Sequence, residues 1–138
     1  MLRIELLSWD QARAEASRIR FAVFVEEQRV PPEIELDAQD RACLHALAYL
    51  EGEVVGTGRL LPDGHIGRMA VVRSSRGKGV GSAILQALID AAKARGDGAV
   101  ALSAQTHAVE FYRRHGFTAE GEVYEEAGIP HQAMSRRV

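Results

Sequence analysis

The sequence predicts a single α/β domain with a mixed β-sheet. The chain has 138 residues, which is enough for one domain with its own hydrophobic core. Strand-like and helix-like segments follow one another in the order β-α-β-β-β-α-β-α-β-β, which is typical of an α/β protein. No internal repeat, low-complexity tract or linker interrupts this order. We therefore expect one domain that spans residues 1–138.

Composition and charge restrict the class of protein. Hydrophobic residues make up 46% of the chain and charged residues 26%, as in soluble globular proteins. The single cysteine, Cys43, cannot form an internal disulfide, and no apolar run is long enough to span a bilayer. The N-terminal residues lack the apolar core of a signal peptide. A net charge of −2 argues against a general nucleic-acid binder, so we expect a cytoplasmic protein that binds neither nucleic acid nor membranes.

The first elements are a strand and a capped helix. Residues 3–7 predict a short strand, and Ser8 with Gln11 forms a capping-box pattern that begins a helix. This helix has an apolar face and ends near Gln28, before a Pro-Pro pair. Residues 30–41 predict an acidic loop that contains the prolines.

Three strands and a long helix follow. Residues 44–50 and 53–61 predict strands joined by a Glu-Gly turn, which is a hairpin signal. Residues 65–72 predict a third strand after a Pro-Asp-Gly turn. A glycine-rich turn then leads into a helix whose apolar residues form one stripe from Val80 onward and which ends at Gly96.

The C-terminal part predicts a buried strand, a short helix and two closing strands. The strand covers residues 99–105, and the helix covers residues 108–115. The closing strands cover residues 117–126 and 131–138, around an Ala-Gly turn. The whole chain therefore predicts about six to seven strands flanked by about three to four helices.

The turn before the long helix, RGKGVG at residues 76–81, has glycines at alternate positions. Glycine permits a positive φ, and its missing Cβ lets a ligand approach the backbone. The first turn of a helix carries unpaired N–H groups and a partial positive charge, which suit a phosphate. The spacing differs from a P-loop and from a dinucleotide-binding fingerprint. Two interpretations stay open: a phosphate site, or a turn whose glycines only permit tight packing.

About half of the chain resembles the GCN5-related N-acetyltransferase (GNAT) superfamily. Arg76, Gly79 and Gly81 match that family's Arg/Gln-x-x-Gly-x-Gly/Ala pyrophosphate loop. The segment AVEFYRRHGF is similar to its Ala-x-x-x-Tyr-x-x-x-Gly-Phe signature. The segments RFAVFVEEQRVPPEIELDAQD and GIPHQAM look like the family's small bacterial ElaA/YjcF-type branch. The resemblance implies a GNAT-like fold, with a mixed, largely antiparallel, twisted sheet.

The resemblance also implies the substrates and the cofactor-binding residues. In this family acetyl-CoA lies where two parallel strands splay apart, and it acetylates an amine acceptor. The main-chain groups of Met69, Ala70 and Val71 would pair with the pantetheine arm. Arg73 is either a further phosphate contact or a solvated arginine. The resemblance places the pyrophosphate against Arg76, Gly77, Lys78, Gly79, Val80, Gly81 and Ser82.

Departure of the thiolate needs a proton donor, and Tyr112 occupies the family's general-acid position. The open alternative is that Tyr112 only packs with Phe111 and Phe117, because helical aromatic residues often belong to the core. Many family members have an asparagine seven residues before this tyrosine, where its side chain holds the pantetheine. Here that position is Gln105, and His107 is an alternative contact.

The general base is not determined by the sequence. We favour Glu27 and His131, which fall where the family's acceptor site begins and where its groove closes. A water relay, or no dedicated base, stays open. The histidines lack metal-ligand spacing, so we expect no metal. The full set of candidate bases is Glu26, Glu27, His45, His65 and His131.

The acidic stretch at residues 33–40 has two interpretations. It attracts a cationic acceptor to the groove, or it is a solvated loop. We expect an acetyl-CoA-dependent N-acetyltransferase acting on a small molecule or a peptide. The rival hypotheses are a non-catalytic acyl-CoA-binding module and an interaction protein whose glycine turn binds nothing. A homodimer is compatible with all three.

Overall fold

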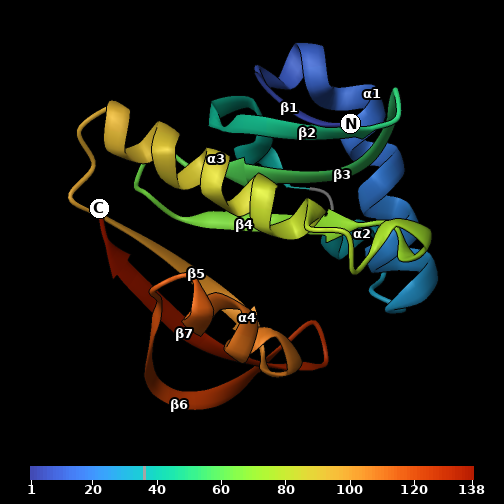
Figure 1. The fold of residues 1–138 in the computed structure, drawn as a ribbon. Coiled ribbons are helices and arrows are strands. Elements are labelled where there is room, and N and C mark those ends of the chain that lie inside the picture. The colour runs from blue at the N-terminus through green and yellow to red at the C-terminus, as the bar shows by residue number, and fades with distance from the viewer. Residues whose placement is uncertain (36) are drawn as a thin grey trace.

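The computed structural model describes residues 1–35 and 37–138. These residues form two antiparallel sheets, with helices packed against them (Figure 1). One sheet has the strand order β1-β2-β3-β4, and the other has the order β5-β7-β6. The predicted order of elements is confirmed, and the strands of the predicted mixed sheet fall into two groups. Within the described ranges, no helix is long and apolar enough to cross a membrane.

The four-stranded sheet is covered by a helix on each face. It consists of β1 (Leu2–Leu7), β2 (Leu44–Leu50), β3 (Glu53–Leu60) and β4 (Ile66–Val71). Successive side chains of a strand point to opposite faces. Ala46 and Ala48 of β2 therefore pack in the core cluster of α3 (Val80–Ala94), whereas Leu47 packs with α1 (Trp9–Arg20).

The first helix begins as the sequence predicts. The Ser8 hydroxyl accepts a hydrogen bond from the Gln11 N–H at 3.4 Å, and Gln11 Oε1 accepts one from the Ser8 N–H at 3.3 Å. After Arg20 the helix continues as a π-helical segment, η1 (Phe21–Glu27), which ends before Gln28. The apolar period predicts the length of this element but not its change of winding. Segments of π-helix are frequent at functional sites.

The predicted acidic loop at residues 30–41 is instead partly helical. It contains α2 (Pro32–Glu35) and the 3₁₀ helix η2 (Ala38–Ala42). Proline is accepted in the first turn of a helix, where its missing N–H removes no intrahelical bond, so Pro32 begins α2. The Asp37 side chain caps η2 by accepting from the Gln39 N–H at 3.0 Å.

The second sheet contains β5 (Ala99–Gln105), β6 (Thr118–Glu126) and β7 (Ile129–Arg137). The 3₁₀ helix η4 (Thr106–Ala108) and α4 (Val109–Arg114) connect β5 to β6. The two sheets join at an isolated parallel bridge between His65 and Ala101, where the Ala101 N–H donates to the Gly64 carbonyl at 3.1 Å. Beyond this bridge β4 and β5 separate (Figure 1).

A candidate active site between the two sheets

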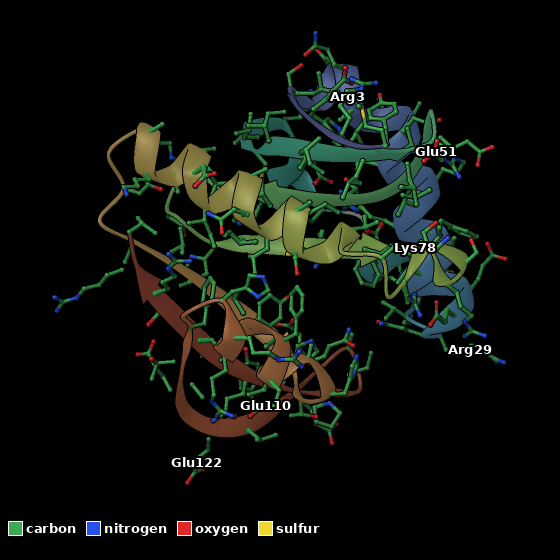
Figure 2. The ribbon with its side chains drawn as sticks, in the orientation of Figure 1. Arg3, Arg29, Glu51, Lys78, Glu110 and Glu122 are labelled. Carbon is green, nitrogen blue, oxygen red and sulfur yellow. The ribbon has the colours of Figure 1, made fainter. Side chains whose placement is uncertain are left out.

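A cleft of about 1450 Å³ opens where β4 and β5 separate. Its wall includes β4, the glycine-rich loop with the start of α3, the end of β5, α4 and the end of η1. Every predicted catalytic and cofactor position lines this cleft except Lys78. Lys78 projects from the glycine-rich loop and does not contribute to the wall (Figure 2). Residues predicted from separate segments therefore meet in one place.

The glycines of the loop are required by backbone conformation and not by packing. Gly77 and Gly79 have φ angles of 77° and 81°, in the region that side chains with a Cβ rarely adopt. Apart from each glycine and its two chain neighbours, no atom of the described residues lies within 4 Å of the position that a Cβ would occupy. The tight-packing interpretation therefore fails at these two positions. Both residues face open space in the cleft wall.

The start of α3 offers free backbone donors to the cleft. Gly79 is the N-cap residue, and it supplies no side chain to cap the first turn. The first intrahelical bond runs from the Ala83 N–H to the Gly79 carbonyl at 3.1 Å. The N–H groups of Val80, Gly81 and Ser82 precede that bond and have no carbonyl partner within the helix. Donors in this arrangement, at the positive end of a helix, suit an anionic group.

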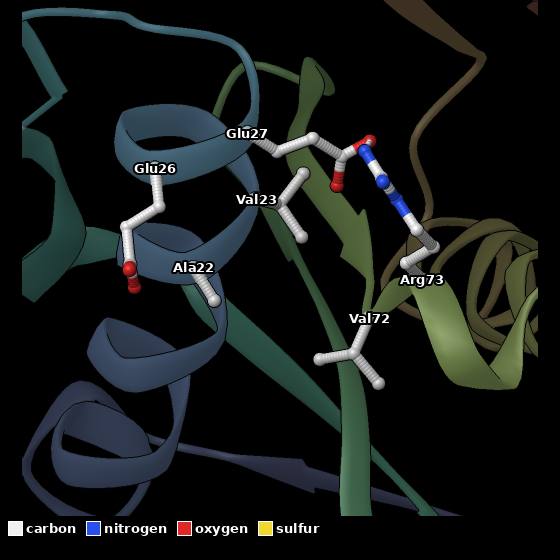
Figure 3. Close-up of a pocket in the computed structure, with 6 residues that line it drawn as sticks. All are labelled: Ala22, Val23, Glu26, Glu27, Val72 and Arg73. Atoms are coloured by element: carbon white, nitrogen blue, oxygen red, sulfur yellow. Dashed lines mark ion pairs between the residues drawn. The ribbon is translucent and has the colours of Figure 1, made fainter.

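Glu27 and Arg76 form a bidentate ion pair beside this loop. Arg76 Nη1 and Nη2 donate to the two Glu27 carboxylate oxygens at 2.6 and 2.7 Å, and Arg76 Nε donates to the Val71 carbonyl at 2.9 Å. Arg73 Nη2 lies 3.4 Å from the same carboxylate (Figure 3). The hydrogen bond from Arg76 lowers the pKa of Glu27 below its usual value. Glu27 is therefore a carboxylate that orients Arg76.

A smaller cavity of about 340 Å³ also has Glu27 in its wall. It is formed by η1 and by Val72 and Arg73, which follow β4 (Figure 3). Glu26 points to this cavity and does not line the large cleft. Glu26 is exposed, and it shares the wall of this smaller cavity with Glu27.

Tyr112 faces β4 across the cleft. Its hydroxyl lies 3.8 Å from Met69 Sδ, and its ring packs edge-on against Phe111 and Phe117. Burial raises the pKa of Tyr112 to about 12. The phenol therefore carries its proton at neutral pH and is available as a donor. The ring packs against the core while the hydroxyl reaches β4, so the packing interpretation holds for the ring and the general-acid role of the hydroxyl stays a prediction.

Gln105 pairs with a residue that the sequence did not single out. Gln105 Nε2 donates to Gln28 Oε1 at 2.9 Å, and Gln28 Nε2 donates to Gln105 Oε1 at 3.3 Å. This reciprocal pair connects the end of β5 to the end of η1, and both residues line the cleft. His107 also lines the cleft.

The candidate histidines differ in position. His131 of β7 lines the cleft and is 6% exposed. Its Nδ1 lies 2.7 Å from the Ile129 carbonyl. A carbonyl only accepts, so Nδ1 carries a hydrogen, and in the neutral ring Nε2 is the nitrogen that can accept a proton. His65 is exposed and pairs with Asp63, whereas His45 is buried against Trp9 outside the cleft wall, and burial lowers its pKa.

The acidic stretch does not form a solvated loop. Three of its carboxylates, at Glu35, Asp37 and Asp40, are paired with three arginines that come from α1, β3 and β4. Asp40 binds Arg20 and Arg59 at 2.8 Å each. We call the six residues the arginine–carboxylate cluster; they are Arg20, Glu35, Asp37, Asp40, Arg59 and Arg68. Sequence reasoning missed its arginines, although an arginine inside an apolar helix face or strand is a signal of a buried pair.

Arg68 is held in an irregular part of β4. Thr57 of β3 pairs with Ala70, but Arg59 pairs with Gly67, so Arg68 and Met69 together face Gly58. Arg68 has a φ of 48°, a left-handed value that costs about 1–2 kcal/mol for a residue with a Cβ. Bulges of this kind re-aim side chains beside active sites.

The chain matches a known family over most of its length. A family model described as an acetyltransferase (GNAT) domain matches residues 11–138. The uncharacterized N-acetyltransferase YjcF of Bacillus subtilis is 40% identical over 126 residues, which cover 88% of this chain and 90% of YjcF. The protein ElaA of Escherichia coli is 35% identical over 130 residues, which cover 88% of this chain and 84% of ElaA.

Solved structures agree with this match. The crystal structure of Escherichia coli ElaA has a TM-score of 0.85 and 33% identity, and covers 99% of both chains. The crystal structure of an acyl-CoA N-acyltransferase from Pseudomonas aeruginosa gives the same values. The family model, the sequence relatives and the solved structures all indicate the same family. The bacterial proteins ElaA and YjcF are among the relatives, which confirms the resemblance predicted from the sequence. The chain belongs to the GNAT acetyltransferase family.

Proposed function

We propose that this protein transfers an acetyl group from acetyl-CoA to a primary amine. One observation carries the proposal: a single cleft joins the uncapped start of α3 to the protonated hydroxyl of Tyr112. The first suits a pyrophosphate, and the second suits a leaving thiolate. An acyl-CoA needs both features, at opposite ends of its pantetheine arm.

The residues of the cleft fit this co-substrate. The N–H groups of Val80, Gly81 and Ser82, with those of Gly77 and Gly79, bind the pyrophosphate. Arg76 and Arg73 add positive charge at this end, and Glu27 orients Arg76. The open edge of β4 at Met69, Ala70 and Val71 pairs with the pantetheine amides as an added strand would. Gln105 supplies a side-chain amide near the same arm.

The reaction forms one bond and breaks one. The amine nitrogen bonds to the thioester carbonyl carbon, and the carbon–sulfur bond breaks. A main-chain N–H of β4 near Met69 donates to the carbonyl oxygen as negative charge develops there. Tyr112 gives its proton to the departing thiolate. The nitrogen loses a proton to a base, so the products are an amide and coenzyme A.

Of the two bases that the sequence favours, His131 suits the role better. Its Nε2 is an acceptor, and the Nδ1–H bond to the Ile129 carbonyl holds the ring in place. Nε2 lies 3.7 Å from Glu126 Oε2. The Glu27 carboxylate is instead saturated by Arg76 and Arg73, and its lowered pKa makes it a weak base.

The test is calorimetric titration of the protein with acetyl-CoA, followed by measurement of thiol release with a panel of primary amines. Micromolar binding together with amine-dependent thiol release supports the transferase. Binding without release by any amine favours an acyl-CoA-binding module. Absence of binding would refute both the transferase and the acyl-CoA-binding module, and would leave the glycine-rich loop without a ligand.

A further inference from the structure

The acceptor end of the cleft presents a charged surface that comes from the arginine–carboxylate cluster. Glu35, Asp37, Arg59 and Arg68 of this cluster line the cleft. Arg68 directly precedes Met69, whose sulfur contacts the Tyr112 hydroxyl. Arg68, Met69 and Tyr112 line the same cleft, so a group bound by Arg68 lies in the cleft that holds the proposed chemistry.

The carboxylates of the cluster have little capacity left for a ligand. The side chains of Glu35 and Asp40 are 8% and 3% exposed. Asp37 is 26% exposed, but each of its oxygens already accepts two hydrogen bonds. Oδ1 accepts from the Gln39 N–H and from Arg59 Nη1, and Oδ2 accepts from Arg59 Nη2 and from Arg68 Nη2. A cationic ligand would find no unused oxygen on Asp37.

Arg68, in contrast to these carboxylates, has hydrogen-bond donors left for a ligand. Its side chain is 28% exposed, compared with 2% for Arg20 and 6% for Arg59. Among the described residues its guanidinium makes one hydrogen bond, from Nη2 to Asp37 at 3.1 Å. Within the described ranges its Nε is buried without a hydrogen-bond partner, and the Glu35 carboxylate lies 3.7 Å away. Donors on the other nitrogens therefore remain available.

The electrostatic environment of Arg68 also favours an anion. Desolvation, followed by the charge of Arg59, lowers the pKa of Arg68 below the usual arginine value. An anionic ligand reduces both penalties, because it pairs with the desolvated guanidinium and opposes the charge of Arg59. The left-handed φ of Arg68 holds the side chain in this position at a cost in backbone energy.

We infer that Arg68 binds a carboxylate of the acceptor substrate, so that the acceptor is a small amine with a free carboxylate, as in an amino acid. The planar guanidinium matches a carboxylate through two parallel hydrogen bonds. The inference rests on the proposed function, since it names the acceptor class of the same site. Phe24 and Val30 also line the cleft and suit an apolar side chain on this acceptor.

The test uses a matched pair of probes, N-acetyl-L-leucine and N-acetyl-L-leucinamide, which differ in the carboxylate. Each is titrated by calorimetry into the protein alone and into the protein saturated with coenzyme A. We expect the carboxylate probe to bind about tenfold more tightly than the amide, a difference of about 1.4 kcal/mol, because a hydrogen bond to a charged group is stronger than one between neutral groups. Arg68→Gln should remove this preference, and Arg68→Lys should retain part of it.

Arg18→Gln is the matched control, because Arg18 is an exposed, ion-paired arginine outside the cleft. This variant should keep the full preference. Equal affinity for the two probes, no binding of either probe, or a preference that survives Arg68→Gln overturns the inference. If Arg68→Gln does not fold, the wild-type preference and its reduction in Arg68→Lys decide. Coenzyme A titrated by itself tests the proposed function separately.

Discussion

At positions 77 and 79 the backbone adopts φ angles of 77° and 81° beside an open cleft. At position 112 a phenol is buried with its hydroxyl against Met69. At position 27 a carboxylate is held by two arginines. In each case the role of one residue follows from its conformation or its partner. These roles can be tested one at a time.

Tyr112→Phe removes a single hydroxyl. We expect the affinity for acetyl-CoA to stay almost unchanged, because the ring still packs against Phe111 and Phe117. The kcat should fall by about 10²–10⁴-fold, the usual contribution of a general acid. Calorimetry and steady-state kinetics together check this. A lower melting temperature with unchanged kcat would instead show that Tyr112 is only a core residue.

The raised pKa of Tyr112 has a consequence for stability. The pKa is about 12 in the folded protein, whereas an unfolded tyrosine has a pKa of about 10. Above pH 10 the unfolded chain loses this proton more readily than the folded chain. The free energy of unfolding contributed by Tyr112 is therefore complete below pH 10 and declines as the pH rises towards 12. Urea titrations of the wild type and Tyr112→Phe across this range should show the wild type losing more stability than the variant.

Glu27 and His131 separate cofactor binding from catalysis. Glu27→Gln removes the carboxylate that orients the Arg76 guanidinium, so the KM for acetyl-CoA should rise several-fold with a smaller effect on kcat.

His131→Gln removes the proposed proton acceptor and should lower kcat by about 10²–10⁴-fold at neutral pH. Initial-rate kinetics with both substrates varied distinguishes the two. The reverse pattern would assign the base to Glu27.

At the scale of elements, the loop and helix that form the pyrophosphate site act as a unit. Gly79 supplies no side chain to cap the first turn of α3, which leaves the N–H donors of that turn for a ligand. The capped α1 is the contrast, because Ser8 and Gln11 satisfy its first donors. The sequence distinguishes the two helix starts, since Ser8 is a capping residue and Gly79 is not.

Gly81→Glu tests this element. The Gly81 position faces the Phe111 ring at 3.5 Å and lines the cleft, so a glutamate side chain brings bulk and negative charge to the proposed pyrophosphate site. We expect acetyl-CoA binding to fall below detection by calorimetry. Ser8→Ala is the control: it should cost about 1 kcal/mol of stability through the lost cap and leave the affinity unchanged. Intact affinity in Gly81→Glu would refute the assignment of the loop.

At the scale of the whole molecule, the arginine–carboxylate cluster connects segments that are distant in the chain. Asp40 of η2 joins Arg20 at the end of α1 to Arg59 of β3. The cluster therefore fixes the wall of the cleft to the four-stranded sheet. Its charges also balance, since three arginines meet three carboxylates.

Asp40→Asn should be strongly destabilising. The substitution leaves two buried arginines without a shared carboxylate, and breaking a buried pair costs about 3–5 kcal/mol. Thermal unfolding should show a clearly lower midpoint. Glu15→Gln is the control, because it removes only an exposed ion pair with Arg18 within α1. It should change stability by less than about 1 kcal/mol. Equal effects of the two substitutions would contradict the role of the cluster.

The sequence by itself determined the element order, the capped start of α1, the glycine-rich start of α3 and the family. Local signals carry these features, because a capping box, a glycine turn and an apolar period depend on neighbouring residues. The family signature then placed Tyr112 and the loop in the cleft, where the structure has them. Even so, the sequence did not predict the π-helical segment or the two short helices of the acidic stretch.

Only the tertiary structure decided which charges meet. Arg20, Asp40 and Arg59 lie far apart in the chain, and their pairing depends on how α1 and η2 pack on the sheet. The same holds for Gln28 with Gln105 and for Glu27 with Arg76. Taken alone, the acidic stretch allows either a cationic acceptor or a solvated loop, but in the described residues pairing saturates Asp37 and leaves Arg68 with unused donors. Long-range packing sets these partners, and for that reason no local pattern contains them.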